Sequence, residues 1–231
     1  MRVGITLPQF REDAETALGV ARHAEAIGLD GLFAFDHLWP IGRPDRPALH
    51  MLPFLGALAV ETERVVVGSL VARVGLFPDA VLVNGLRTVA RMAGEDRFVA
   101  GLGVGDRLSR AENEAYGVPF APVAERVASL VTSCRELRAA GVPVWVGGRS
   151  TAVQEVAVAE ADALNLWQSP VEEVAARRGT VLTWAGQVGP DDDVRSLLAG
   201  LRDAGATWAV CAPIGQPWPE AVERIAAAAA A

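Results

Sequence analysis

The chain has 231 residues, of which 51% are hydrophobic and 21% charged, so it can bury a substantial core and lacks the composition of a disordered protein. Its formal net charge is −7, and all 21 basic residues are arginines that form no basic run, which argues against binding to nucleic acid or to an anionic membrane. Cys134 and Cys211 fall in separate predicted elements and suggest no disulfide framework. Without an 18-residue apolar stretch or a signal-peptide pattern, the chain is expected to be a soluble cytoplasmic protein.

Short apolar strands alternate with amphipathic helices along the chain. Asp13 can cap the first helix, and Gly28 can end it. Strands are expected at residues 1–7, 31–35, 64–71, 97–102, 144–146, 163–167, 181–184 and 207–211. Helices are expected at residues 14–27, 53–61, 78–93, 122–140, 151–160, from 170 onward, at 191–204 and at 220–231.

Each of the eight strands is followed by a helix, and this alternation predicts a parallel sheet of the α/β class. The number of units and the chain length favour a (β/α)8 TIM barrel that spans residues 1–231 as a single domain. An open doubly wound sheet is the alternative, because spacing along the chain does not prove closure. In a barrel the loops after the strands share one face, so the residues that follow each strand are the candidates for function.

The segment after the fourth strand carries more than packing requires. Two glycines one residue apart, Gly103 and Gly105, flank Val104 and let a backbone or a ligand approach closely. Asp106 then places a carboxylate at the mouth of the strand. A flat or anionic group is expected to rest at this point.

The segment after the fifth strand reads Gly147-Gly148-Arg149-Ser150 and leads directly into a helix. The free N–H groups and the positive end of the helix dipole make such a start an anion site, and Arg149 and Ser150 add donors. A tight turn without a ligand is the alternative reading. Its place in the predicted barrel favours phosphate.

Among the three histidines, His37 alone stands at the carboxyl end of a strand, where it could exchange a proton or hydrogen-bond to a redox ring. The alternative is a histidine held by Asp36 and a backbone carbonyl. A metal site is not expected, because no second histidine recurs at ligand spacing and the cysteines lie on separate elements. The proline-rich loop 38–53 and the loop 107–120, with a helical turn near 111–116, are long enough to serve as lid or binding loops.

Four segments in order resemble the bacterial luciferase-like monooxygenase family, namely residues 24–38, 62–71, 96–105 and 144–150. The resemblance runs from residue 1 to about residue 167. It implies a TIM barrel that binds FMN or the deazaflavin coenzyme F420 at its carboxyl face, and it implies a homodimer.

Carried over position by position, the resemblance implies that His37 faces the ring and that Leu70-Val71 forms a strand bulge with a non-prolyl cis peptide behind it. His37 and Asp106 are the implied catalytic residues. The implied cofactor-binding residues are Leu70, Val71, Ala72, Gly103, Val104, Gly105, Gly147, Gly148, Arg149 and Ser150. Arg43, Arg73 and Arg149 are candidates for contact with the anionic tail of a deazaflavin.

The chain also departs from the family pattern. Ala72 and Arg73 stand where members usually carry Thr or Ser and Asn after the bulge, and Val89-Ala90 replaces the usual Leu-Asp. The chain is shorter than most members, and the missing length falls near the seventh strand, where the family often inserts lid segments.

The leading hypothesis is an F420-dependent enzyme that transfers a hydride to or from a small organic substrate. The first alternative is an FMN-dependent monooxygenase that works with a separate reductase. The second is a non-catalytic protein that binds cofactor or a protein partner, which Ala72 and the missing lid segments would favour.

Overall fold

A computed structural model describes residues 1–94 and 96–231. The strands are β1 (Arg2–Thr6), β2 (Gly31–Ala34), β3 (Val66–Ser69), β4 (Ala72–Arg73), β5 (Phe98–Gly103), β6 (Val144–Gly147), β7 (Ala163–Trp167), β8 (Leu182–Val188) and β9 (Ala206–Pro213). The helices are α1 (Ala14–Ala26), α2 (Met51–Glu61), α3 (Asp79–Ala93), α4 (Arg110–Ala115), α5 (Val123–Ala139), α6 (Thr151–Glu160), α7 (Val171–Ala176), α8 (Val194–Asp203) and α9 (Trp218–Ala229), with a 3-10 turn η1 (Arg107–Ser109).

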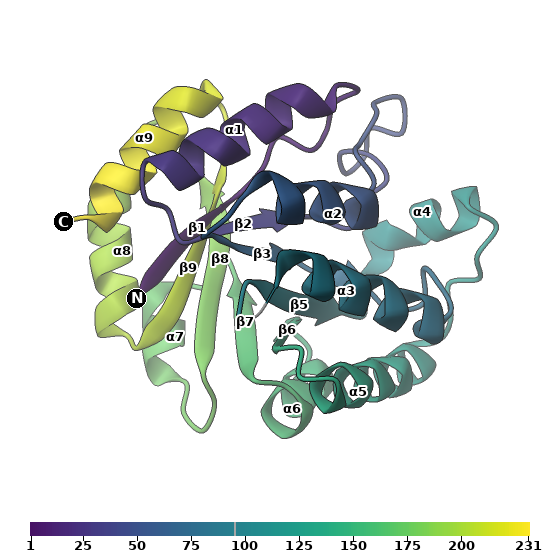
Figure 1. The fold of residues 1–231 in the computed structure, drawn as a ribbon. Coiled ribbons are helices and arrows are strands. Elements are labelled where there is room, and N and C mark those ends of the chain that lie inside the picture. The colour runs from purple at the N-terminus through teal and green to yellow at the C-terminus, as the bar shows by residue number, and fades with distance from the viewer. Residues whose placement is uncertain (95) are drawn as a thin grey trace.

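The strands close into a barrel with the helices outside it (Figure 1). Every strand pair is parallel, and the order runs from β3 through β2, β1, β9, β8, β7 and β6 to β5. Pairing of β3 with β5, at Val67 with Phe98 and Gly68 with Val99, joins the two ends of this order. The predicted (β/α)8 TIM barrel is therefore confirmed, and the open doubly wound sheet is excluded.

The third strand position of the barrel differs from the continuous strand predicted at 64–71. It consists of β3 and β4, which are separated by Leu70 and Val71, and the peptide bond between these two residues is cis. Pairing with β5 resumes at Ala72, opposite Leu102. The predicted strand-three bulge and its cis peptide are confirmed.

The last two strands of the barrel, β8 and β9, are longer than predicted. β8 continues from Trp184 to Val188, because its pairing with β9 runs on through Gly186 opposite Cys211 to Val188 opposite Pro213. Gly186 and Gln187 carry little strand preference of their own. A partner strand supplies the order that the local sequence lacks.

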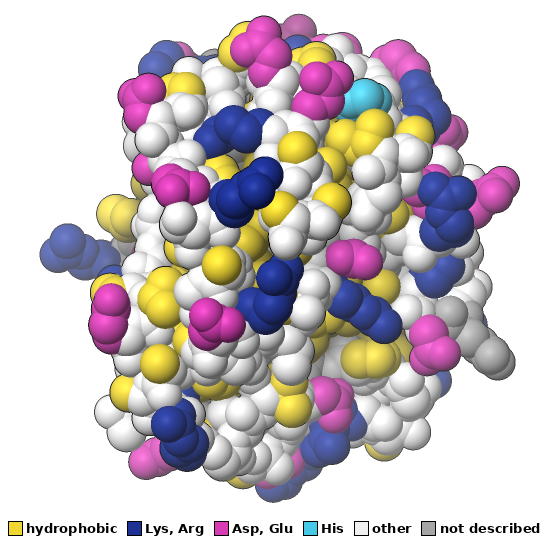
Figure 2. Space-filling view, turned by 90° about the vertical axis from the view of Figure 1, so that its left-hand side faces the viewer, with side chains coloured by type: hydrophobic (Ala, Val, Ile, Leu, Met, Phe, Trp, Pro, Cys, Tyr) yellow, Lys and Arg dark blue, Asp and Glu magenta, His cyan; other side chains and the backbone are white. Residues whose placement is uncertain are grey.

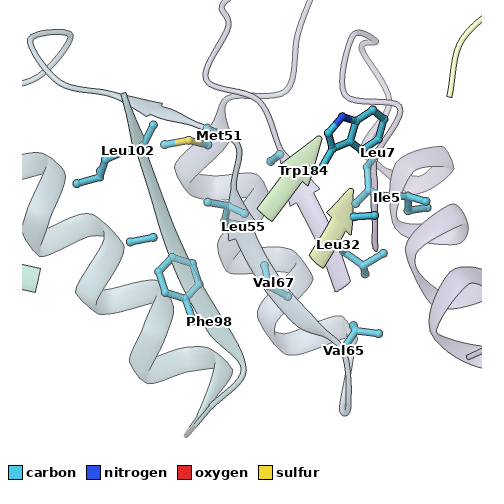
Figure 3. Packing of buried hydrophobic residues seen from close by; sticks show 14 of the residues in the cluster. Ile5, Leu7, Leu32, Met51, Leu55, Val65, Val67, Phe98, Leu102 and Trp184 are labelled. Carbon is cyan, nitrogen blue, oxygen red and sulfur yellow. The ribbon is translucent and has the colours of Figure 1, made fainter. Parts of the chain in front are cut away.

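The main core lies between the barrel and the helices. Outward-facing strand residues such as Ile5, Leu32 and Val67 pack in one cluster with Leu55 and Met51 of α2 (Figure 3). The remaining labelled members are Leu7, Val65, Phe98, Leu102 and Trp184, which belong to the same cluster.

Aromatic side chains fill the interior of the barrel. The ring of Phe33 lies 5.4 Å from that of Trp145 and 5.8 Å from that of Trp208. Gly31 and Gly68 make this possible, because a Cβ at either position would lie 2.7 Å from an atom of Trp208 or Phe33. The interior below the rim is thus filled by side chains, as is usual for this fold.

The surface is mixed in charge. On the face shown in Figure 2, arginine and acidic side chains are interspersed with apolar atoms. In the described ranges, no helix is both long and apolar enough to traverse a bilayer.

Candidate active site

The carboxyl ends of the parallel strands bring distant parts of the chain to one rim. His37 follows β2, Arg73 ends β4, and the segment 103–106 begins at the last residue of β5. The loop 147–150 begins at the end of β6, which pairs with β5. In Figure 1, α4 lies on the side of the barrel toward which β2 and β5 point. The sequence-predicted site residues therefore share one end of the barrel.

Val71 lies between β3 and β4 at this end of the barrel. Its side chain packs against the aromatic cluster of the barrel interior and remains partly exposed. A Cβ at Gly103 would lie 2.6 Å from Cγ2 of Val71, and one at Gly147 would lie 3.0 Å from its Cγ1. The two glycines thus leave room for the side chain of Val71, which stays partly exposed and presents an apolar surface.

His37 is held by a carboxylate that sequence reasoning missed. Its Nδ1 lies 3.0 Å from Oε1 of Glu112, a residue of α4 whose side chain is only 2% exposed. The other carboxylate oxygen of Glu112 accepts a 2.6 Å hydrogen bond from Nη1 of Arg73, which is 3% exposed. A quarter of the His37 side chain remains exposed. The imidazole is therefore fixed at one nitrogen and accessible at the rim.

Asp36 joins the same network through a hydrogen bond from the backbone of Arg73. Its Oδ2 accepts a 2.7 Å hydrogen bond from the backbone N–H of Arg73. The alternative reading, in which Asp36 holds His37, is not what the structure shows, since the imidazole is bound by Glu112.

The two buried carboxylates respond differently to their surroundings. Burial raises the pKa of Asp36 above its usual value, despite the hydrogen bond from Arg73 and the charges of Arg73 and His37. Burial also acts to raise the pKa of Glu112, but the hydrogen bonds and charges of His37 and Arg73 outweigh it and leave this pKa lowered. Glu112 is thus held as a carboxylate beside His37.

Asp106, predicted as catalytic, has a local structural task. Its Oδ1 accepts hydrogen bonds from the backbone N–H groups of Leu108 at 2.8 Å and Ser109 at 3.2 Å, and thereby caps η1. Its side chain is exposed at the rim. A catalytic role for Asp106 stays a prediction.

Hydrogen bonds from Arg126 of α5 hold the segment between β5 and η1. Arg126 donates to the carbonyls of Val104 and Gly105, the latter at 2.9 Å. Gly105 has a positive φ of 67°, and a Cβ there would lie 2.6 Å from Cδ of Arg73. Glycine at this position therefore serves both the turn and the close approach of Arg73.

The loop 147–150, predicted as an anion site, leads directly into α6. Gly147 and Gly148 are partly exposed, and Arg149 and Ser150 are exposed. Ser150 is the N-cap of α6, and its hydroxyl accepts from the N–H of Val153 at 3.4 Å. The remaining N–H groups of the first turn and the Arg149 side chain are the donors available to an anion.

The three arginines proposed for an anionic tail differ in their surroundings. Arg43 is exposed and pairs with Asp45 at 3.0 Å, whereas Arg73 is buried on Glu112. Nε and Nη2 of Arg73 are buried and have no hydrogen-bond partner within the described part of the chain. Arg149 stays exposed beside the anion loop.

An aromatic wall, formed by Phe10, Phe35 and Trp167, lies among the residues that follow or end β1, β2 and β7. Phe10 and Phe35 stack with ring centroids 6.0 Å apart, and Phe35 meets Trp167 of β7 edge to face, also at 6.0 Å. Phe35 and Trp167 are only partly buried. Their accessible faces offer an apolar surface to a bound molecule.

A separate hollow of about 470 Å³ opens at the amino end of the barrel, far from the rim. Glu25 and Arg97 line it, and both bind backbone: Glu25 accepts from the N–H groups of residues 63–65, and Arg97 donates to the carbonyls of Thr62, Val65 and Ala93. These contacts hold chain segments together. The amino end of such a barrel contributes stability rather than chemistry.

The structure also bears on metal binding. Within residues 1–94 and 96–231, no group of three or more His, Cys, Asp or Glu side chains is placed to hold a metal ion. Cys134 and Cys211 are both buried and free.

The sequence signal for Glu112 was weak. The residue lies in a long loop with a predicted helical turn, but nothing in its immediate neighbours distinguishes it from the nearby Glu114. The structure separates the two, because Glu112 is buried and Glu114 is exposed.

Relatives of this chain carry names that refer to one coenzyme. It is 33% identical over 129 residues to an F420-dependent glucose-6-phosphate dehydrogenase of Beutenbergia cavernae, an alignment covering 55% of this chain and 36% of that protein. For the protein of the same name from Nakamurella multipartita, identity is 31% over 144 residues, covering 62% and 40%. The matched regions thus span well under half the length of these curated relatives.

Solved structures share the fold. An F420-dependent secondary alcohol dehydrogenase, in complex with an F420-acetone adduct, superimposes with a TM-score of 0.82 at 12% identity, covering 98% of this chain and 97% of that one. An F420-dependent tetrahydromethanopterin reductase from Methanopyrus kandleri gives a TM-score of 0.74 at 11% identity, covering 98% of each chain. Residues 1–202 match the family model described as luciferase-like monooxygenase, and the chain therefore belongs to the luciferase-like monooxygenase family.

Proposed function

We propose that this protein is a coenzyme F420-dependent oxidoreductase that transfers a hydride to or from a small organic substrate. The observation that carries the proposal is the order of groups around the rim. His37 follows β2, Val71 lies between β3 and β4, and the loop 147–150 begins at the end of β6. One elongated molecule can therefore reach all three. The names of the relatives and of two of the structural neighbours support F420 as that molecule.

The residues at the rim fit such a coenzyme. Val71, for whose side chain Gly103 and Gly147 leave room, would give a planar ring an apolar surface. The start of α6, with Arg149 and Ser150, would hold a phosphate. Leu70, Val104 and Gly105 are proposed to line the same site. The side chain of Ala72 is fully buried in the core between the barrel and the helices, so only its backbone could contribute there.

Coenzyme F420, when bound, supplies a deazaflavin ring that accepts or gives up a hydride. A residue of the chain must then accept or donate the proton that accompanies hydride transfer. With Nδ1 bound to Glu112, Nε2 is the nitrogen of His37 left for the substrate. It would take the hydroxyl proton of a substrate alcohol as the carbon loses its hydride, or return a proton in the reverse direction.

The aromatic wall indicates the kind of substrate. Phe10, Phe35 and Trp167 would pack against the apolar part of a small organic molecule and exclude water from the ring. Residues 35–50 connect β2 to α2 without helix or strand. The proline-rich loop predicted at 38–53, whose last residues belong to α2, is proposed to cover the site as a lid.

Titration of the purified protein with F420 and, separately, with FMN tests the proposal. We expect F420 fluorescence to change at micromolar coenzyme and FMN fluorescence to change little. Preferential binding of FMN would favour the alternative, a monooxygenase with a separate reductase. Failure to bind either at submillimolar concentration would leave the non-catalytic alternative, which Ala72 favours.

We further propose that residues 1–231 form one domain and that the protein is a cytoplasmic homodimer. A single cooperative unfolding transition would support one domain. Light scattering coupled to size exclusion would measure the mass of the particle. Two separate transitions or a monomeric mass would contradict the respective proposal.

A further inference from the structure

We infer that Glu112 and Arg73 form a positioning pair that fixes the proton of His37 on Nδ1, so that Nε2 is the nitrogen that exchanges protons with substrate. The inference rests on the proposed function in assigning His37 that exchange. Neither member of the pair is placed in contact with substrate, and both act through His37.

The carboxylate of Glu112 has one task at each oxygen. Oε1 lies 3.0 Å from Nδ1 of His37 and 3.3 Å from the backbone N of Leu38, and Oε2 lies 2.6 Å from Nη1 of Arg73. A carboxylate accepts hydrogen bonds and donates none when ionised. Nδ1 of His37 must therefore carry a proton, in the neutral as well as the charged imidazole.

Arg73 keeps Glu112 ionised and in place. The guanidinium is nearly fully buried, its backbone N–H is bound by Asp36 at 2.7 Å, and its Nη1 also reaches the carbonyl of Ser109 at 3.4 Å. A Cβ at residue 105 would lie 2.6 Å from Cδ of Arg73, so Gly105 is what admits this side chain. The arginine is thus confined, and it can only donate.

These donor and acceptor roles predict the effect of Glu112→Gln. A glutamine has one oxygen and one NH2 group, and the oxygen is expected to face Arg73, because the charged guanidinium at 2.6 Å is a stronger donor than the backbone N–H of Leu38 at 3.3 Å. The NH2 group then faces His37 and forces Nδ1 to accept. The proton of the neutral imidazole moves to Nε2, which reverses the tautomer.

The same reasoning predicts a rescue. In the double variant Glu112→Gln with Arg73→Met, the glutamine no longer needs to turn its oxygen toward residue 73. The amide can place its oxygen against His37 and the N–H of Leu38, where the carboxylate oxygen of Glu112 accepts in the wild type. We expect the proton to return to Nδ1. A loss of packing alone would not be reversed by a second substitution in the same network.

The experiment reads the tautomer directly in the coenzyme-free protein. Histidine labelled with nitrogen-15 gives imidazole correlations that distinguish Nδ1–H from Nε2–H in mildly alkaline buffer, and His37→Gln identifies the His37 signals. We expect Nδ1–H in the wild type, Nε2–H in Glu112→Gln, and Nδ1–H in the double variant. Glu114→Gln, an exposed neighbour on α4, is the matched control and should resemble the wild type.

Two outcomes would overturn the inference: a wild-type protein with the proton on Nε2, or a folded Glu112→Gln variant with an unchanged tautomer. The wild-type measurement decides the matter even where the single variant does not fold. Circular dichroism establishes folding of each variant.

Activity supplies a second readout. With F420 bound, we expect Glu112→Gln to lower the turnover rate by about 100-fold at unchanged coenzyme affinity, and the double variant to recover part of it. Equal turnover in Glu112→Gln and the wild type would contradict the pair's role in catalysis. Failure of the wild type to use F420 would instead refute the proposed function, while the tautomer result would stand on its own.

Discussion

His37 and Glu112 are 75 positions apart in the sequence, yet Nδ1 of the histidine lies 3.0 Å from a carboxylate oxygen of the glutamate. Glu112 is buried and ionised, with its pKa lowered, and Arg73 binds its other oxygen. The contact joins the loop after β2 to α4, and it leaves one imidazole nitrogen accessible at the barrel mouth.

Replacement of His37 should separate chemistry from binding. We expect His37→Ala to lower turnover with F420 by about 100-fold or more, because the proton partner is lost, while coenzyme affinity changes little. Steady-state kinetics and fluorescence titration measure the two quantities. His23→Ala, on α1 and away from the rim, is the control and should behave as the wild type. Undiminished turnover in His37→Ala would show that another group handles the proton.

Gly148 tests the anion loop. In Gly148→Asp a carboxylate would stand against a bound phosphate, and repulsion of about 1 to 4 kcal/mol corresponds to a roughly 5- to 1000-fold loss of coenzyme affinity. A Cβ at this position would also lie 2.6 Å from Cγ1 of Val153, so Gly148→Ala measures the steric part alone. Titration of both variants isolates the charge effect. Equal affinities in the two would remove the phosphate from this loop.

Gly101 is expected to be essential for packing beneath the rim. A Cβ there would lie 2.0 Å from the carbonyl oxygen of Ser69, whose hydroxyl donates to the carbonyl of Gly101 at 2.8 Å. Backbone atoms must shift to admit it, so Gly101→Ala should lower the free energy of unfolding by about 3 kcal/mol in urea titrations. Gly19→Ala is the matched control, because no atom lies within 4 Å of its added Cβ and α1 gains a better helix former. Similar stabilities of the two variants would refute the steric argument.

Glu25 predicts a pH-dependent contribution to stability. Burial acts to raise its pKa, but hydrogen bonds from the N–H groups of Arg64, Val65 and Glu63 and the charge of Arg64 outweigh it, so the pKa is lowered. The ionised form therefore stabilises the fold at neutral pH, and this contribution is lost as the pH falls from the unfolded value of about 4.3 through the lower folded value. Glu25→Gln should cost about 1 kcal/mol at pH 7 and less in acid.

The measurement is the difference in unfolding free energy between Glu25→Gln and the wild type as a function of pH. Glu12→Gln, an exposed site before α1, should show no such trend. A Glu25→Gln deficit that stays constant from neutral to acid pH would indicate that charge contributes nothing at this position.

The sequence by itself was enough for the alternating strands and helices, the barrel, the family and the bulge at Leu70-Val71. Each of these follows from short-range patterns or from motifs a few residues long, because local hydrophobic period and glycine placement act on neighbours in the chain. The ends of β8 were misjudged for the same reason, since Gly186 depends on pairing with Cys211.

Only the tertiary structure decided which side chains meet. It joined Glu112 and Arg73 to His37, and it gave Asp106 a helix to cap. These contacts depend on how β2, β4 and α4 converge at the rim, and nothing in the residues next to Glu112 records which partner lies opposite. A buried charge is tolerated only where the fold places its counter-charge, so the closed barrel determines the site.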